Sequence, residues 1–295
     1  MKKGLSECRR RFRWERWNCS FSKKITSKIL KRKFLPEVTK EIAYMNAITS
    51  ASVALRLATA CHKGEISRCC TAPLRKAFKR KLTDKKEAED EHTRFGLWIT
   101  EYFTDFKIKP KKYIMDKAVA IRHNNKIGRN VVKHMAKRFC RCHGTSGMCS
   151  LKTCAGHLPT LKQVGTTIRY LYKLAYKGKV VKNFMLRPTV SRNAVDLTDV
   201  LVYLSESPDY CKVNQSHGSQ GTIGRACRIP VRDSTRGSKG HCNELCYSCG
   251  FSIRYEVRPK KVRCNCKFRW CCEVRCETCR YDEDVLVCHV PKKGR

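Results

Sequence analysis

The stretch Cys140-Arg-Cys-His-Gly-Thr-Ser-Gly-Met-Cys149, followed by Cys154, decides how the rest of the chain is interpreted. Two glycines lie near its tip, and glycine adopts positive φ angles without steric cost, so the chain can turn sharply on both sides of Ser146. We therefore expect one serine hydroxyl to be held out on a rigid loop. The four cysteines can pair in a nested way that staples a hairpin: Cys142 with Cys149 and Cys140 with Cys154.

The composition combines a strong positive charge with many cysteines. The 295 residues carry 64 Lys and Arg against 25 Asp and Glu, a formal net charge of +39. Such an excess points to a polyanionic partner, and nucleic acid, an anionic membrane and a sulfated glycan all qualify on charge alone. These partners occur in different cellular compartments, so the compartment of the protein selects among them. The number of cysteines indicates that compartment, because disulfides persist only where conditions are oxidising.

The 21 cysteines are unevenly distributed and odd in number. Five precede residue 71, none lies between residues 71 and 139, four lie at 140–154 and twelve at 211–288. This density is typical of oxidised, secreted chains and unusual in the reducing cytosol unless a metal is bound. The odd count leaves at least one thiol over or pairs it with another molecule.

Hydrophobic periodicity predicts helices in the first part of the chain and short strands in the last part. After Ser207, cysteine-rich segments separated by turn residues indicate paired strands held by bridges and not by a large core. The segments with a helical pattern are 36–60, 91–107, 111–138 and 161–175. The predicted fold class is α+β, with a helical domain at 1–176 that carries the protruding hairpin (140–154), a basic linker at 177–206 and a cysteine-rich β-hairpin domain at 207–295.

Several motifs resemble those of the Wnt family of secreted growth factors. The stretch at 140–149 resembles the lipidated hairpin of that family, and the match continues through nearly the whole chain. The resemblance implies a secreted, lipid-modified glycoprotein ligand that acts in development and is not an enzyme. The other matching motifs are Glu7-Cys-Arg-Arg-Arg-Phe-Arg-Trp-Glu-Arg-Trp-Asn-Cys19, His123-Asn-Asn125, Ser207-Pro-Asp-Tyr-Cys211 and Cys264-Asn-Cys-Lys-Phe-Arg-Trp-Cys-Cys272.

In the Wnt family, the serine that matches Ser146 carries a cis-unsaturated fatty acyl ester. The resemblance implies the same lipid on Ser146, with no other cofactor and no metal. Without the flanking cysteines, Ser146 would be an ordinary polar turn serine. A catalytic role is disfavoured, because the stretch lacks the second glycine of a G-x-S-x-G elbow and His143 lies too close in sequence to act as its base. No catalytic residue is predicted.

A second set of nested bridges is predicted at residues 264–279, with Cys264 paired to Cys279 and Cys266 to Cys276. The tip between them has little core to pack into, so its aromatic residues are typical of an exposed binding site. Arg269 stands where a histidine is common in the family. In Wnt proteins this tip contacts the Frizzled cysteine-rich domain, and the resemblance assigns that role to Phe268, Trp270, Cys271, Cys272 and Val274. The adjacent pair Cys271–Cys272 can form a vicinal bridge.

The remaining cysteines are expected to complete a disulfide frame. Cys8 is predicted to pair with Cys19, and Cys61 with Cys69. Cys70 is predicted to be the free thiol, because residues 71–90 lack the cysteine that the family supplies. Spacing alone cannot choose the connectivity of the C-terminal cysteines. The family frame implies the pairs Cys211–Cys249, Cys227–Cys242 and Cys246–Cys288.

Four asparagines are candidates for glycosylation or for a structural role. Asn18 and Asn214 begin glycosylation sequons, although a neighbouring bridge would hinder the use of Asn18. Asn124 and Asn125 lie inside the third predicted helix. They are either a solvated or locally hydrogen-bonded pair, or, as the resemblance implies, a structural polar site near the lipidated hairpin.

The resemblance also implies the partners and the location. The partners are a Frizzled receptor, a low-density-lipoprotein-receptor-related co-receptor, a Porcupine-type acyltransferase and the carrier Wntless. The basic residues collectively indicate heparan sulfate and not nucleic acid, in the extracellular space and matrix. Residues 1–8 contain no apolar signal-peptide core, and no run of 18 apolar residues suggests a transmembrane helix. Wnt proteins begin well before the matching stretch, so the chain is expected to lack its N-terminus.

Two alternatives stay open at the level of sequence. Cys246-x-x-Cys249 and Cys276-x-x-Cys279 are loosely similar to a zinc ribbon, which with this charge would indicate a zinc-dependent nucleic-acid-binding protein. The Cys-x-Cys and Cys-Cys pairs inside that span are superfluous to one tetrahedral site. The other alternative is an inactive, truncated Wnt fragment that does not reach the secretory pathway.

Overall fold

The structure, a computed structural model, divides the chain into two compact units. Unit 1 comprises Met1–Phe12, Cys19–Pro208 and Gln215–Gly218, and unit 2 comprises Arg13–Asn18, Asp209–Asn214 and Ser219–Arg295. No described helix is long and apolar enough to cross a membrane. The described residues are 2–22, 36–66, 91–105, 115–144, 148–150, 152–181, 185–188, 199–228, 241–270 and 273–291.

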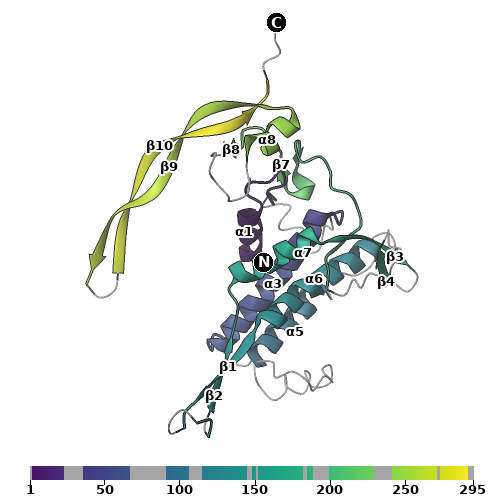
Figure 1. The fold of residues 1–295 in the computed structure, drawn as a ribbon, viewed down its shortest axis with the longest axis vertical. Helices are drawn as coiled ribbons and strands as arrows, with labels where there is room; N and C mark the ends of the chain where they lie inside the picture. The colour runs from purple at the N-terminus through teal and green to yellow at the C-terminus, as the bar shows by residue number, and fades with distance from the viewer. Residues whose placement is uncertain are drawn as a thin grey trace. The chain divides into compact units, whose positions relative to one another are not determined.

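Unit 1 is built around one central helix, α3 (Figure 1). Most residues of α3 are buried, because its many Ala, Ser and Thr side chains let other helices approach from several sides. The four predicted helices are confirmed, with boundaries that shift by a few residues. The described helices of this unit with eight or more residues are α1 (Lys2–Arg11), α3 (Lys40–His62), α5 (Glu91–Asp105), α6 (Met115–Met135) and α7 (Leu161–Lys173).

Two glycines allow α5 and α6 to lie directly against α3. A Cβ atom on Gly96 would lie 2.5 Å from the carbonyl oxygen of Ala54, and one on Gly128 would overlap the carbonyl oxygen of Ala47. Real Cβ atoms do not approach backbone this closely, so both crossings require glycine. The resulting packing is backbone against backbone and leaves little room for adjustment.

The Asn124–Asn125 pair is buried, so its interpretation as a solvated pair is wrong. The Asn124 side chain donates to the carbonyl oxygen of Val202 (2.8 Å) and accepts from its N–H (2.9 Å). Asn125 donates to Asp105 (2.9 Å), which also forms a buried ion pair with Arg129 (2.8 Å). Buried polar groups need such partners. The two asparagines are therefore structural, and their partners lie in β5 and at the end of α5 and not in the hairpin.

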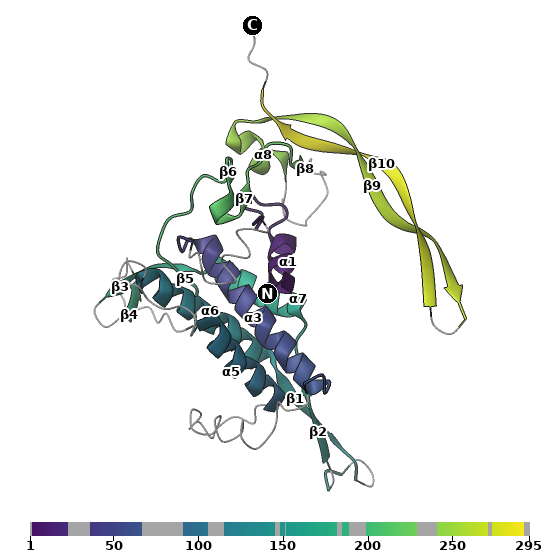
Figure 2. The same ribbon diagram turned by 180° about the vertical axis from the view of Figure 1, so that it is seen from behind.

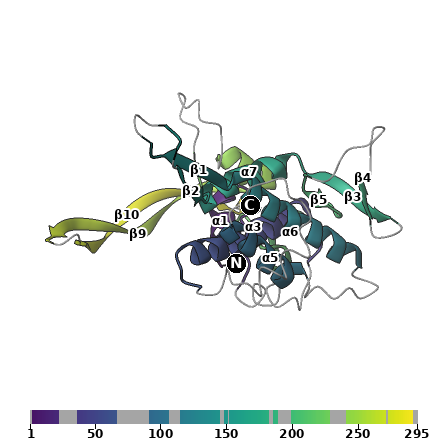
Figure 3. The same ribbon diagram turned by 90° about the horizontal axis from the view of Figure 1, so that it is seen from below.

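The predicted linker at 177–206 contains strands that belong to unit 1. They are β3 (Tyr176–Val181), β4 (Met185–Pro188) and β5 (Val202–Tyr203), in the order β4-β3-β5, with β3 and β4 running side by side (Figure 3). Backbone hydrogen bonds attach this region to the helices, because the N–H groups of Leu204 and Ser205 donate to Val38. Unit 1 therefore continues through Pro208.

Unit 2 includes residues 13–18, far from the rest of it in sequence. The half-buried guanidinium of Arg225 holds this segment by donating to the carbonyl oxygens of Arg13, Glu15 and Arg16 (3.0, 2.6 and 2.7 Å). Burial lowers the pKa of Arg225 to about 10. The N-terminal segment thus contributes to both units.

Cystines occupy the centre of unit 2. A cluster of Cys227, Cys242, Leu245, Cys246 and Cys288 is buried, and a few partly buried apolar residues pack on it. Bridges in place of a large apolar core were predicted, and the structure confirms them. The described strands and helices of this unit are β6 (Val213–Asn214), β7 (Ser219–Gln220), β8 (Ala226–Cys227), α8 (Cys242–Leu245), η5 (Tyr247–Cys249), β9 (Ser252–Arg269) and β10 (Glu273–His289).

Substituting Gly128→Ala should destabilise unit 1, because the new methyl group meets backbone that cannot move aside. Overpacking costs about 1–3 kcal/mol, and the better helix propensity of alanine returns only about 1 kcal/mol. Denaturant unfolding would measure the loss. The control is Lys126→Ala, at an exposed position of the same helix, which should change stability by less than about 0.5 kcal/mol. Equal stability of the two variants would contradict the close crossing.

Candidate functional site: two disulfide-held hairpins

The first hairpin projects beyond the ends of the unit 1 helices (Figure 1). It consists of β1 (Lys137–Cys142) and β2 (Lys152–His157), paired antiparallel with Cys140 opposite Cys154. Cys142 and Cys149 form a disulfide, and Cys140 is also disulfide-bonded. This is the stapled hairpin that the cysteine spacing predicted.

The tip of this hairpin closes through Gly144. Its N–H donates to the carbonyl oxygen of Met148 (2.7 Å), and a Cβ atom at this position would overlap that same oxygen. Gly144 does not have a positive φ, so close approach, and not the left-handed conformation that glycine permits, is the reason for glycine here. Ser146 and its two neighbours lie outside the described residues. The described residues on either side, Gly144 and Met148, lie within hydrogen-bonding distance of each other.

Apolar side chains are exposed along the first hairpin. Phe139 is 59% exposed and contacts His157 edge-on across the strands, and Met148 is 67% exposed. A thin two-stranded hairpin has no interior that could bury them. Exposed apolar residues at such a site indicate contact with an apolar partner.

The second hairpin is the long twisted ribbon of β9 and β10 (Figure 2). Cys264–Cys279 and Cys266–Cys276 staple it near its end. Between these bridges the register shifts, so that Asn265 and Cys266 lie opposite the single residue Cys276. Asn265 has a φ of 47°, and its side chain donates to Glu277 (2.8 Å). This β-bulge was not predicted, because asparagine is a weaker signal for positive φ than glycine.

The tip of the second hairpin exposes its aromatic residues. Trp270 is 94% exposed and Phe268 is 69% exposed. Phe268 pairs across the ladder with Val274, which is also exposed. Cys271 and Cys272 lie outside the described residues, so their vicinal bridge stays a prediction. Phe268 and Trp270 lack a core to pack into, as expected of a binding tip.

Seven of the predicted disulfides are present among the described residues. Cys61 is disulfide-bonded, while Cys69 and the predicted free thiol Cys70 lie outside the described residues. Asn18 and Asn214 are half-buried, and their glycosylation stays a prediction. Besides those of the two hairpins, the bridges are Cys8–Cys19, Cys211–Cys249, Cys227–Cys242 and Cys246–Cys288.

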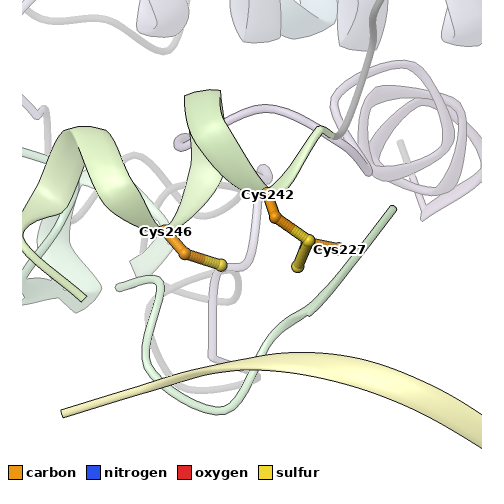
Figure 4. Close-up of side chains that lie close together, drawn as sticks. All are labelled: Cys227, Cys242 and Cys246. Carbon is orange, nitrogen blue, oxygen red and sulfur yellow. A yellow bond between two sulfur atoms is a disulfide. The ribbon is translucent and has the colours of Figure 1, made fainter. Parts of the chain in front are cut away.

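The zinc ribbon is contradicted by these bridges. Each of its four cysteines, at 246, 249, 276 and 279, is bonded to a different cysteine outside the set. Cys227, Cys242 and Cys246 do gather closely (Figure 4), but the first two form a disulfide and the third bonds to Cys288. Zinc binds thiolates, and a disulfide sulfur is not one. Both groups are therefore structural.

Comparison with known proteins agrees with this frame, since the model of the Wnt family matches residues 1–289. The chain belongs to the Wnt family. Wnt-8 of Xenopus laevis is 32% identical over 285 residues, which cover 94% of this chain and 78% of that protein. Wnt-2b of Homo sapiens is 33% identical over 301 residues, covering 98% and 72%. Wnt family ligands are secreted developmental signalling proteins, not enzymes.

A solved structure shares this Wnt fold. The structure of human WLS in complex with WNT8A contains a chain that matches with a TM-score of 0.69 and 30% sequence identity. The match covers 97% of this chain and 90% of the other. The arrangement of a helical first part and a strand-rich, disulfide-held last part is therefore that of a Wnt ligand.

Replacing the bulge residue should loosen the second hairpin. Placing a residue other than Gly, Asn or Asp in the left-handed region costs about 1–2 kcal/mol, and the cost is highest for a β-branched residue. Asn265→Val should therefore speed the hydrogen exchange of amides between the two bridges by roughly tenfold. Asn265→Gly, which keeps the backbone geometry, is the control and should exchange nearly as the wild type does. Equal protection in both variants would show that the bulge does not depend on residue 265.

Proposed function

We propose that this chain is a lipid-modified Wnt ligand that binds the Frizzled cysteine-rich domain through two contacts, an acyl chain on Ser146 and the Phe268/Trp270 tip. The observation that carries the proposal is the exposure of Trp270 at the end of a ribbon stapled by two disulfides. A large aromatic side chain presented to solvent on a constrained loop loses little conformational entropy on binding. Such residues dominate the binding energy of protein interfaces.

The acyl chain would supply the larger share of the binding free energy. Burying hydrocarbon contributes roughly 0.8 kcal/mol per methylene, so a sixteen-carbon chain contributes on the order of 10 kcal/mol before ordering costs. The first hairpin cannot shield such a chain, because Phe139 and Met148 are themselves exposed. The lipid would therefore seek an apolar groove on a partner protein.

The two contacts reinforce one another because they lie on one chain. Once the first is made, the second forms at a high effective concentration, so the combined affinity exceeds that of either contact alone. In this proposal the ligand acts by binding alone and catalyses no reaction on its partner. Signalling would follow from bringing Frizzled together with a low-density-lipoprotein-receptor-related co-receptor.

The route to the cell surface follows from the same chemistry. A Porcupine-type acyltransferase would add the lipid to Ser146, and Wntless would carry the acylated chain, in line with the solved complex of human WLS with WNT8A. The net charge of +39 supports retention by heparan sulfate in the matrix. The disulfides argue for an oxidising, secretory environment.

Removing the acylated hydroxyl should abolish both secretion and receptor binding. Ser146→Ala, expressed in a eukaryotic host, should yield a peptide without the acyl mass, protein retained in the cell, and no binding to a Frizzled cysteine-rich domain. Ser150→Ala, an exposed serine of the same hairpin, is the control and should be acylated and secreted normally. Normal secretion and binding of Ser146→Ala would refute the lipid contact.

Truncating the tip should weaken receptor binding without affecting the fold. Trp270→Ala should cost about 2 kcal/mol or more, which is roughly a thirtyfold rise in Kd. Tyr255→Ala is the matched control, because Tyr255 is an exposed aromatic residue on the same ribbon, far from the tip. Binding by surface plasmon resonance would separate the two. Equal losses for both variants would show that the tip is not the contact.

A further inference from the structure

The β9–β10 ribbon has two faces with different charge patterns. Successive side chains of a strand point to opposite faces, so the register assigns each residue to one of them. On the first face most of the charged residues are joined in ion pairs. Hydrogen bonds from Arg258 hold the pKa of Glu256 below its ordinary value, and a hydrogen bond to Glu283 raises the pKa of Lys260. The ion pairs of this face join Arg254 and Arg258 to Glu256, Lys260 to Glu283, and Arg275 to Glu273.

The opposite face carries three exposed cations, Lys261, Arg263 and Arg280, here called the basic trio. Lys261 lies directly opposite Arg280 in the ladder, and Arg263 follows two residues later toward the tip. Like charges at directly opposed positions destabilise a sheet. Among the residues that the structure describes, no ion pair joins any member of the trio to a carboxylate. The hairpin therefore keeps an unfavourable arrangement that an anionic surface would relieve.

The residues around the basic trio indicate what kind of surface this is. On the same face, the Phe268–Val274 pair lies toward the tip, and Asp282 and Asp284 lie toward the base. From Val274 to Arg280 is six residues, or about 20 Å of strand. The face thus changes from apolar to basic to acidic. A sulfated glycan running along the ribbon would meet the two aspartates directly after the trio, whereas a folded protein can present one acidic patch and end there.

We propose that the basic trio is an additional docking surface, which binds an acidic patch on the protein that receives the tip, about 20 Å from the pocket for Phe268. This inference rests on the proposed function, because it takes the tip as the first contact of the same hairpin. Charges at such a distance from the central contact act mainly on the association rate and on its dependence on salt. The trio would align the ribbon before the aromatic tip engages.

Single charge reversals test this surface without threatening the fold. Lys261→Glu and Arg280→Glu each turn a repulsive cross-strand pair into an attractive one, so both variants should fold. Lys212→Glu is the matched control, because it makes the same charge change at an exposed lysine of unit 2 that lies outside the ribbon. Phe268→Ala reports on the tip itself. Binding to a Frizzled cysteine-rich domain would be measured for all four at several salt concentrations, with heparin retention measured in parallel.

The expected result is a loss of affinity on the order of tenfold for Lys261→Glu and for Arg280→Glu near 0.15 M salt, through slower association, with a smaller loss at high salt. Lys212→Glu should bind as the wild type does. Wild-type affinity of both reversals, with a loss for Phe268→Ala, would overturn the docking surface and leave the proposed function intact. Wild-type affinity of every variant would overturn both. Unchanged receptor binding with heparin retention lowered only by Lys261→Glu and Arg280→Glu would assign the trio to a glycan and overturn the proposal.

Discussion

Cross-strand disulfides are the constraint on which both projecting hairpins depend. A two-stranded ribbon is only marginally stable in water, and most of β9 and β10 has no third strand beside it, since β8 pairs only with Leu286 and Val287. The Cys264–Cys279 bridge closes a loop with a sequence separation of 15, which disfavours the unfolded chain by about 3 kcal/mol in the loop-entropy model. Disulfide bonds therefore stabilise this hairpin in place of a buried apolar core. The side chains between the bridges stay available for contact with a partner.

Unit 1 reaches rigidity by a different route. Its helices pack at short range through Gly96 and Gly128 against the backbone of α3, and a buried polar cluster around Asp105 and Arg129 crosses between helices. Asn124 connects the helical part to the start of β5 through both the nitrogen and the oxygen of its side-chain amide. A hairpin is a useful binding element only if its base is fixed, and β1 begins at Lys137, directly after the end of α6.

Sequence alone predicts those parts of the structure that depend on local periodicity or on covalent chemistry. The helices at α3, α5, α6 and α7 follow from apolar spacing, and the stapled hairpins follow from nested cysteines. The disulfides of the C-terminal frame came from the family resemblance, because twelve cysteines allow too many pairings for spacing to choose. The helix α1 is short and strongly basic, with only Leu5 and Cys8 as apolar residues, so it was not expected.

Other features could not be predicted from the sequence because they depend on tertiary contacts. Strands β3, β4 and β5 are two to six residues long and are held by backbone pairing, which leaves no sequence pattern. The inclusion of residues 13–18 in unit 2 depends on Arg225, more than 200 positions away in sequence. The bulge at Asn265 depends on the register between two bridges, and the resulting face assignment cannot be obtained by counting residues from the tip.

The same constraint explains why an unfavourable charge arrangement can persist on the ribbon. In an ordinary hairpin, cross-strand side-chain pairs contribute much of the stability, so directly opposed cations would be eliminated. Here Cys264–Cys279 lies directly beside the Lys261, Arg263 and Arg280 positions and fixes the strands whatever their side chains do. Sites that break a local rule while the surrounding structure enforces the geometry are where function is expected. The contrast between the two faces is informative for this reason: most charged residues of one face form ion pairs with one another, whereas the three cations of the other face form none among the described residues.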